Sequence, residues 1–141
     1  MSHGSVYALL YDRDCGLCRT IVAAALSLDR DGRLHPLALQ DEQAVALLAG
    51  MSDEQRMASF HIVEESTAAV ASAGAGLALL AVALPATGPL GRMLRRSPRF
   101  TDFAYRLIAG NRDRIGPLIP RGVKSRATRR IAEAEARAEH A

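Results

Sequence analysis

Short apolar segments alternate with segments of helical periodicity over the first 84 residues of the chain. This alternation restricts the fold, because a strand, a helix and a second strand in succession form a right-handed crossover with parallel strands. The apolar run at 6–11 ends at Asp12, and apolar residues recur at helical spacing from Leu17 to Leu28. Because the run is apolar throughout, we expect a strand that is buried on both faces.

The alternation continues along the chain. It predicts further strands at 34–39, 60–65 and 67–72 and helices at 41–50 and 75–84, with a polar connection at 51–56. The order βαβαββα indicates an α/β fold in which a parallel pair is completed by an antiparallel hairpin. Additional C-terminal helices are predicted at 90–96, at 101–115 with Thr101 as its cap, and at 128–141. The last of these has little apolar surface, so we expect it to fray.

The length of the chain indicates one domain. A chain of 141 residues can bury one hydrophobic core but is too short for two independent ones. Only 4% of the residues are aromatic, so Ala, Leu, Val and Ile must build most of that core. We expect residues 1–115 to form the domain, and residues 116–141 to form a flexible basic segment and a terminal helix.

Charge is unevenly distributed along the chain. Acidic residues outnumber basic ones up to residue 91, whereas basic residues dominate 92–130. Such asymmetry can mark a surface for nucleic acid, anionic lipid or an acidic protein. No aromatic residues interleave with the arginines as a base-stacking surface requires, so a solvated helical face is the simpler interpretation and nucleic-acid binding is not expected.

Two observations bear on localisation. The longest uncharged stretch, 66–91, is rich in Gly, Ala and Ser and contains Pro85 and Pro89, which argues against a membrane span. Residues 1–5 lack the basic region of a secretory signal. We therefore expect a cytoplasmic protein without a membrane span.

The only two cysteines, Cys15 and Cys18, lie at the junction of the first strand and the first helix. At this spacing they share one helical face, with Cys15 in the cap or first turn. Unpaired N–H groups and the helix dipole stabilise a thiolate at Cys15. Cys18, one turn deeper, can attack the Cys15 sulfur and release a substrate thiol from a mixed disulfide. A CxxC between a strand and a helix predicts redox chemistry, with Cys15 as nucleophile and Cys18 as resolving thiol.

Other uses of the cysteines stay open. A structural zinc site needs four ligands, but there is no third cysteine and the four histidines show no ligand spacing: His3, His35, His61 and His140. Two thiolates could still bind a soft metal transiently. The pair could also be small core residues or a permanent disulfide, although the polar flanks and the absence of an export signal disfavour these two.

The charged residues around the cysteines have two interpretations. Asp12 is either a helix-entry residue that accepts backbone N–H bonds or a carboxylate that takes the proton of Cys18. Asp14 is more typical of a cap. The negative charge of Asp14 opposes a thiolate at Cys15, and the positive charges of Arg13 and Arg19 offset it.

These residues carry a family resemblance. The pattern Y-D-x-x-C-x-x-C at 11–18 resembles the DCC family of thiol-disulfide oxidoreductases, and YRLIAGNR at 105–112 and FHIVEE at 60–65 are similar to its late helix and middle strand. The resemblance covers about residues 6–115. It implies a thioredoxin-like fold, which agrees with the βαβαββα order, and an oxidoreductase activity carried by Cys15 and Cys18.

The sequence departs from the resemblance at two points. Arg13 stands where the family commonly has glycine, which adds positive charge beside Cys15. No proline precedes the third strand at 57–59, where thioredoxins carry a cis-proline that helps to hold a peptide. Peptide binding of the thioredoxin kind is therefore in question.

We arrive at one leading hypothesis and two alternatives. The first is a dithiol–disulfide oxidoreductase, assisted by Asp12, that needs no cofactor and acts on a disulfide-containing protein or a small-molecule thiol with the help of a reducing partner. One alternative is a binding or adaptor module that docks through its basic half and uses the thiols as a sensor, and the other is soft-metal handling by the cysteine pair. Asn111 and Arg112 are expected to anchor the end of a helix without contacting the cysteines.

Overall fold

The computed structural model describes residues 4–84 and 88–140. Its strands are β1 (Tyr7–Tyr11), β2 (Leu34–Ala38), β3 (His61–Glu64) and β4 (Ala69–Ser72). Its helices are α1 (Gly16–Leu28), α2 (Glu42–Leu47), α3 (Asp53–Met57), α4 (Ala73–Ala83), α5 (Gly88–Arg96), α6 (Pro98–Gly110), α7 (Arg112–Ile115), the 3₁₀ helix η2 (Gly116–Leu118) and α8 (Arg121–Glu139). His3, Pro85 and Ala141, which entered the sequence analysis, lie outside the described residues.

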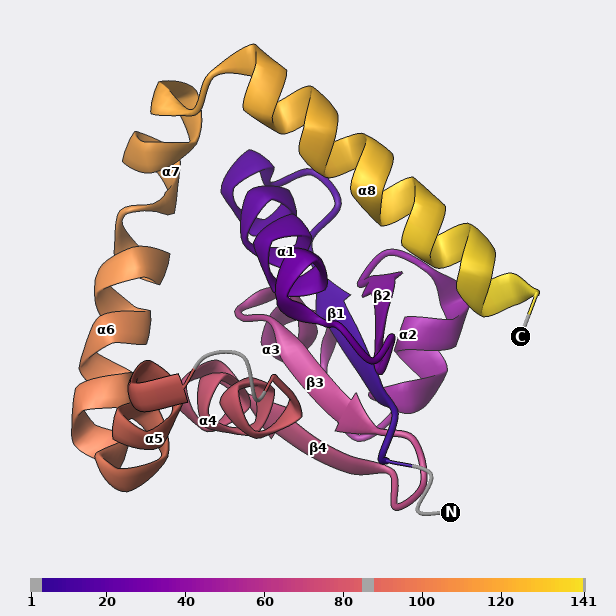
Figure 1. Ribbon diagram of the computed structural model, residues 1–141, viewed down its shortest axis with the longest axis vertical. Helices are drawn as coiled ribbons and strands as arrows, with labels where there is room; N and C mark the ends of the chain where they lie inside the picture. Colours follow the sequence, from indigo (N-terminus) through magenta and orange to yellow (C-terminus); the bar gives the residue numbers. More distant parts are fainter. Residues whose placement is uncertain (1–3, 85–87, 141) are drawn as a thin grey trace.

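The strands form one mixed sheet in the order β2-β1-β3-β4 (Figure 1). β1 runs parallel to β2 and antiparallel to β3, and β4 completes an antiparallel hairpin with β3. The register pairs Tyr11 with Ala38, so the residues that follow β1 and β2 emerge at the same edge of the sheet. The architecture is a mixed α/β fold, compatible with a thioredoxin-like fold.

β1 is buried on both faces, as its uninterrupted apolar run predicts. Leu9 and Tyr11 face a core that the sheet shares with α1, α4 and α8. Ala8 and Leu10 face a smaller core on the other side, shared with α2. The sheet therefore lies between two layers (Figure 1). α1 packs its apolar side, with Val22 and Ala25, on the sheet face that presents Leu9 and Tyr11.

The predicted strands and the first helix are confirmed close to their expected bounds, but the polar connection at 51–56 contains a helix, α3. Its N-terminus is closed by a capping box: the Ser52 hydroxyl accepts from the backbone N–H of Gln55, and the Gln55 side chain accepts from the backbone N–H of Ser52. None of its residues is buried, so the apolar periodicity that marks a helix is absent.

α6 begins at Pro98, before the predicted cap. Thr101 is buried within the helix, where its hydroxyl donates to the carbonyl oxygens of Leu94 (2.7 Å) and Ser97 (3.1 Å). The prediction that Thr101 caps this helix is wrong, because proline already favours the first helical position. The Thr101 hydroxyl instead ties α6 to the preceding helix, α5.

The structure also differs from the expectation of a frayed C-terminal segment. α8 spans 19 residues and buries Ala127, Ile131 and Ala134 as it crosses α1 and β2 (Figure 1). Glu135 accepts a hydrogen bond of 3.0 Å from the hydroxyl of Tyr11 at the end of β1. Small alanines allow the helix to approach closely, so a sparse apolar pattern still provides a packed face. The domain boundary after residue 115 stays a prediction.

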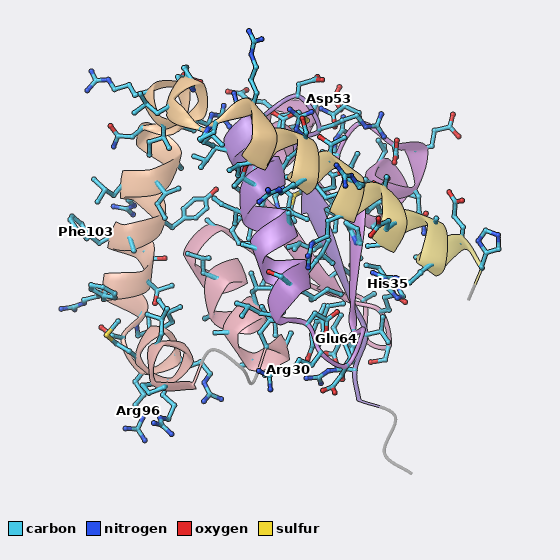
Figure 2. The ribbon with its side chains drawn as sticks, turned by 45° about the horizontal axis from the view of Figure 1, so that its top comes forward. Arg30, His35, Asp53, Glu64, Arg96 and Phe103 are labelled. Carbon is cyan, nitrogen blue, oxygen red and sulfur yellow. The ribbon has the colours of Figure 1, made fainter. Side chains whose placement is uncertain are left out.

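Close packing between α4 and α6 orients the late helices. Gly74 of α4 lies against the side chain of Asp102, which leaves no room for a Cβ atom. On the outer side of α6, Phe103 is 64% exposed and points away from the molecule (Figure 2). On the inner side, the ring centroids of Tyr105 and Phe60 lie 5.7 Å apart. α6 thus positions the segments that follow it, α7 and η2, next to α1.

Candidate active site

The cysteine pair lies at the carboxyl end of β1 and the start of α1. Cys15 is the N-cap residue of α1, with extended backbone angles (φ −94°, ψ 110°), and its own N–H donates to the carbonyl oxygen of Asp12 (3.2 Å). The predicted position of Cys15 in the cap is therefore confirmed. This is the sheet edge at which open α/β proteins place their ligands.

The two thiols are directly connected. Both cysteines are free, and the backbone N–H of Cys18 donates to the Cys15 sulfur at 3.2 Å. The Cys15 sulfur thus accepts a backbone N–H from the first turn of α1.

Cys18 is the shielded, protonated member of the pair. Burial raises the pKa of its thiol to about 12, and the hydrogen bond to Cys15 and the charges of Cys15 and Asp12 act in the same direction. The charge of Arg112 opposes them and lowers this pKa. Cys18 therefore retains its proton at neutral pH and needs an acceptor before it can attack.

Asp12 both shapes the loop and lies near Cys18. Its Oδ1 accepts from the backbone N–H of Asp14 (2.9 Å) and from the side chain of Gln40 (2.8 Å). Asp12 Oδ2 has no hydrogen-bond partner within residues 4–84 and 88–140. The helix-entry interpretation accounts for one oxygen, and the second is free to accept a proton.

The sequence analysis missed Gln40. Its amide nitrogen donates to Asp12, and its carbonyl oxygen accepts from the backbone N–H of Arg13 (3.2 Å). The signal was present in the strand order: Gln40 follows β2 closely, just as Asp12 follows β1, and parallel neighbours end at the same sheet edge. Gln40 fixes the loop that precedes the cysteines.

Arg13 has an ionic partner away from the thiols. Its guanidinium donates to the Asp41 carboxylate at 2.6 Å, and this ion pair fixes its direction toward the start of α2. Because Asp41 balances the charge of Arg13, an effect of this arginine on Cys15 stays a prediction.

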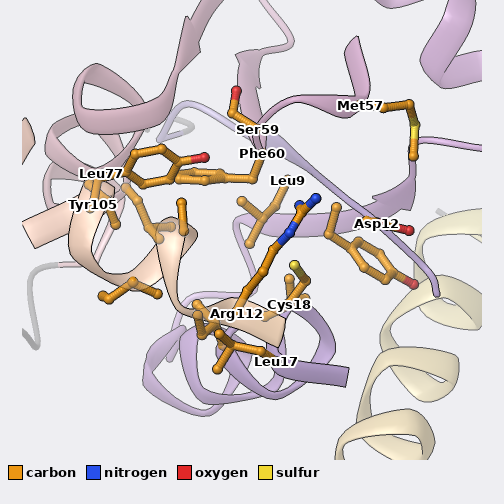
Figure 3. Close-up of a pocket in the computed structure, with 16 residues that line it drawn as sticks. Leu9, Asp12, Leu17, Cys18, Met57, Ser59, Phe60, Leu77, Tyr105 and Arg112 are labelled. Atoms are coloured by element: carbon orange, nitrogen blue, oxygen red, sulfur yellow. The ribbon is translucent and has the colours of Figure 1, made fainter. Parts of the chain in front are cut away.

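An apolar pocket of about 200 Å³ opens beside Cys18 (Figure 3). Its walls come from β1, α1, α4 and α6, and are mostly aliphatic. The Tyr105 hydroxyl lies near the Ser59 side chain and the Phe60 backbone, and burial raises the pKa of this tyrosine. The pocket therefore places an apolar volume directly beside Cys18.

Arg112 lies at this pocket, contrary to the sequence prediction. Its side chain extends across the pocket beside Cys18 (Figure 3). Asn111 behaves as predicted: it is the C-cap residue of α6, and its side-chain amide donates to the Leu107 carbonyl oxygen (2.7 Å). A helix break between α6 and α7 separates the two roles, because it turns Arg112 inward.

Cys15 faces a second, more polar hollow. Arg112 and Lys124 line it together with Asp14 and Asp113, and the Lys124 side chain lies close over Gly16. Part of the basic second half of the sequence is therefore brought to the thiols by α7 and α8. Within residues 4–84 and 88–140, no three His, Cys, Asp or Glu side chains cluster so as to hold a metal, and no helix is long and apolar enough to cross a bilayer.

Comparison with known families identifies the chain. The model of the DCC1-like thiol-disulfide oxidoreductase family matches residues 9–117, which include both cysteines, Asp12 and Arg112. The chain belongs to this family. The match confirms the family resemblance that the DxxCxxC pattern indicated. A search of curated proteins and a search of solved structures each found no significant match. The DCC1-like chain therefore has a general thiol-disulfide oxidoreductase assignment, and its two cysteines have the spacing that this chemistry uses.

Proposed function

We propose that this protein is a dithiol–disulfide oxidoreductase in which Cys15 attacks and Cys18 resolves. The observation that carries the proposal is the position of Cys15 at the helix cap, where its sulfur accepts from the backbone N–H of Cys18. Hydrogen bonds of this kind stabilise a thiolate, which is the nucleophilic form. Membership of the DCC1-like family supports the same chemistry.

The reaction has two exchange steps. The Cys15 thiolate attacks one sulfur of a substrate disulfide, forms a mixed disulfide and expels the other sulfur as a thiolate. Cys18 then loses its proton and attacks the Cys15 sulfur, which breaks the mixed disulfide and releases the second substrate thiol. Two electrons pass to the substrate, whose two thiols take one proton from Cys18 and one from solvent. A small dithiol or a reducing protein then reduces the Cys15–Cys18 disulfide back to two thiols.

Asp12 is the proposed proton acceptor for Cys18. Its charge already acts on the Cys18 thiol, and its Oδ2 is free to take a proton directly or through a water molecule. Gln40 donates to the other oxygen (2.8 Å) and so restricts the orientation of the carboxylate. Asp12 thus combines the structural role and the catalytic role that the sequence left open.

The sheet order supports a thioredoxin-like fold. The pocket indicates which class of disulfide the protein would accept as substrate. Residues 57–59, directly before β3, include no proline that could hold an extended peptide, whereas an apolar pocket of about 200 Å³ lies beside Cys18. We therefore favour small organic disulfides as substrates. The cycle needs a thiol reductant, in line with the expected cytoplasmic location.

Disulfide reduction by the purified protein tests this function. With dithiothreitol as reductant, the wild type should reduce bis(2-hydroxyethyl) disulfide catalytically. Cys15→Ser should abolish turnover, and Cys18→Ser should accumulate a mixed disulfide on Cys15, visible as a mass increase. Full activity in Cys15→Ser would refute the assignment of the nucleophile.

Asp12→Asn separates the two roles of the carboxylate. If Asp12 acted only through its charge, its neutralisation would lower the pKa of Cys18 and speed resolution. As a proton acceptor, its loss should slow resolution of a preformed mixed disulfide by about 100-fold or more. Stopped-flow release of the second thiol measures this step, and a faster release in Asp12→Asn would exclude the catalytic role.

A further inference from the structure

The apolar pocket contains one cationic side chain, Arg112, that has no ionic partner among the described residues. Arg112 lines the pocket and is only partly exposed, yet none of the ion pairs within residues 4–84 and 88–140 includes it. Its side-chain nitrogens also have no hydrogen-bond acceptor among those residues. A partly exposed guanidinium that has no partner in the protein can pair with an anionic ligand.

The rest of the pocket is suited to an apolar chain. Leu9 of β1, Ile21 of α1, Leu80 of α4 and Ile108 of α6 contribute aliphatic walls, and Phe60 closes one side (Figure 3). An apolar volume with one converging charged group is the usual form of a small-molecule site. The Arg112 side chain extends into this volume, so a ligand can bury its chain and pair its anionic group with Arg112 together.

We propose that this pocket binds a small amphipathic monocarboxylate, with its apolar chain against Leu9, Leu80 and Ile108 and its carboxylate on Arg112. A guanidinium pairs with a carboxylate through two parallel N–H···O bonds. We limit the charge of the ligand to one, because Arg112 is the sole cation that lines the pocket in the part of the chain that the structure describes, and the carboxylate of Asp12 lines it too. Glutathione, which carries two carboxylates and an ammonium group, matches this lining poorly.

The site has a direct link to one thiol only. Cys18 lines the pocket, whereas Cys15 lines the adjacent polar hollow at the helix cap, which shares Asp12, Leu17 and Arg112 with the pocket. A ligand in the pocket should therefore cover Cys18 and neutralise the nearby charge of Arg112, and leave Cys15 accessible. This asymmetry provides an internal control within the same molecule.

Calorimetric titration of the reduced protein with hexanoate, octanoate and 1-octanol tests the proposal. Octanoate should bind about tenfold more tightly than hexanoate, because two more methylene groups are buried. The affinity for octanoate should also exceed that for 1-octanol by about tenfold or more, because the alcohol cannot form an ion pair with Arg112. Equal affinity for octanoate and 1-octanol would overturn the assignment of a carboxylate site.

Three variants locate the site. Arg112→Gln should weaken octanoate binding about tenfold or more, whereas Arg114→Gln, exposed on the same short helix, should bind as the wild type does. Ala109→Phe places a ring in the pocket and should abolish binding. Circular dichroism and thermal unfolding establish that each variant is folded. Unchanged octanoate affinity in folded Arg112→Gln or Ala109→Phe would show that the pocket is not the site.

This binding needs no thiol chemistry, so its failure is distinct from failure of the proposed function. A variant with both Cys15→Ser and Cys18→Ser should still bind octanoate, although it cannot exchange disulfides. In the wild type, saturating octanoate should slow alkylation of Cys18 at pH 9.5 and leave that of Cys15 unchanged. Equal protection of both thiols, or of neither, would contradict the placement of the ligand beside Cys18.

Discussion

At the scale of single residues, the two thiols differ in environment and should differ in reactivity. The raised pKa of Cys18, about 12, means that its thiolate fraction increases only as the pH approaches this value. Cys15, with its sulfur at the helix cap, should be alkylated by iodoacetamide near neutral pH. Peptide mapping of the reduced protein over pH 6–11 measures both rates. Identical pH profiles for the two cysteines would contradict the assignment of an activated nucleophile.

Two neighbouring charges should shift the reactivity of Cys18 in opposite directions. The charge of Asp12 raises the pKa of Cys18, so Asp12→Asn should move its alkylation profile to lower pH. The charge of Arg112 lowers this pKa, so Arg112→Gln should move the profile to higher pH. The shifts should shrink in high salt, because partly exposed charges are screened. Arg13→Gln is the control and should leave the profile in place, since Arg13 pairs with Asp41. Shifts of the same sign in Asp12→Asn and Arg112→Gln would contradict this electrostatic account.

At the scale of helices and strands, the sequence predicts what local pattern determines. The strands, α1 and the cap position of Cys15 follow from apolar periodicity and from the polar break after β1. α3 has no buried face, so periodicity could not reveal it. The approach of Arg112 to Cys18 depends on how α6 packs on α4 and where the helix breaks, and neither is encoded in a local pattern. The position of Gln40 beside Asp12 is an intermediate case, because it can be predicted only once the order of the strands is known.

The contact between α4 and α6 offers a test of this packing. Gly74→Ala should cost about 1–3 kcal/mol of unfolding free energy, because the added Cβ would collide with Asp102. Gly122→Ala is the matched control: Gly122 is also the second residue of its helix, but nothing lies near an added Cβ. Gly122→Ala should be neutral or slightly stabilising. Urea unfolding of both variants measures the difference, and equal stabilities would contradict the close approach of α4 and α6.

At the scale of the whole molecule, α8 is part of the folded structure. Ile131 is 4% exposed and belongs to the same core as β1 and α1, so Ile131→Ala should cost about 2–5 kcal/mol of unfolding free energy. Val123, which is 40% exposed on the same helix, should lose less than about 1 kcal/mol when replaced by alanine. Thermal or urea unfolding monitored by circular dichroism compares the two. A small, equal effect of both substitutions would mean that α8 is detached in solution, as its composition first indicated.

The central claim, that Cys15 and Cys18 form a redox-active pair, is tested most directly by a redox titration. The protein is equilibrated with glutathione buffers of increasing oxidation, quenched with acid, alkylated and weighed by mass spectrometry. The account predicts a single transition from two alkylated thiols to an intramolecular Cys15–Cys18 disulfide, with a two-electron slope of about 30 mV per tenfold change in the ratio. Two alkylated thiols at every ratio, or stable glutathione adducts without an internal disulfide, would contradict the account.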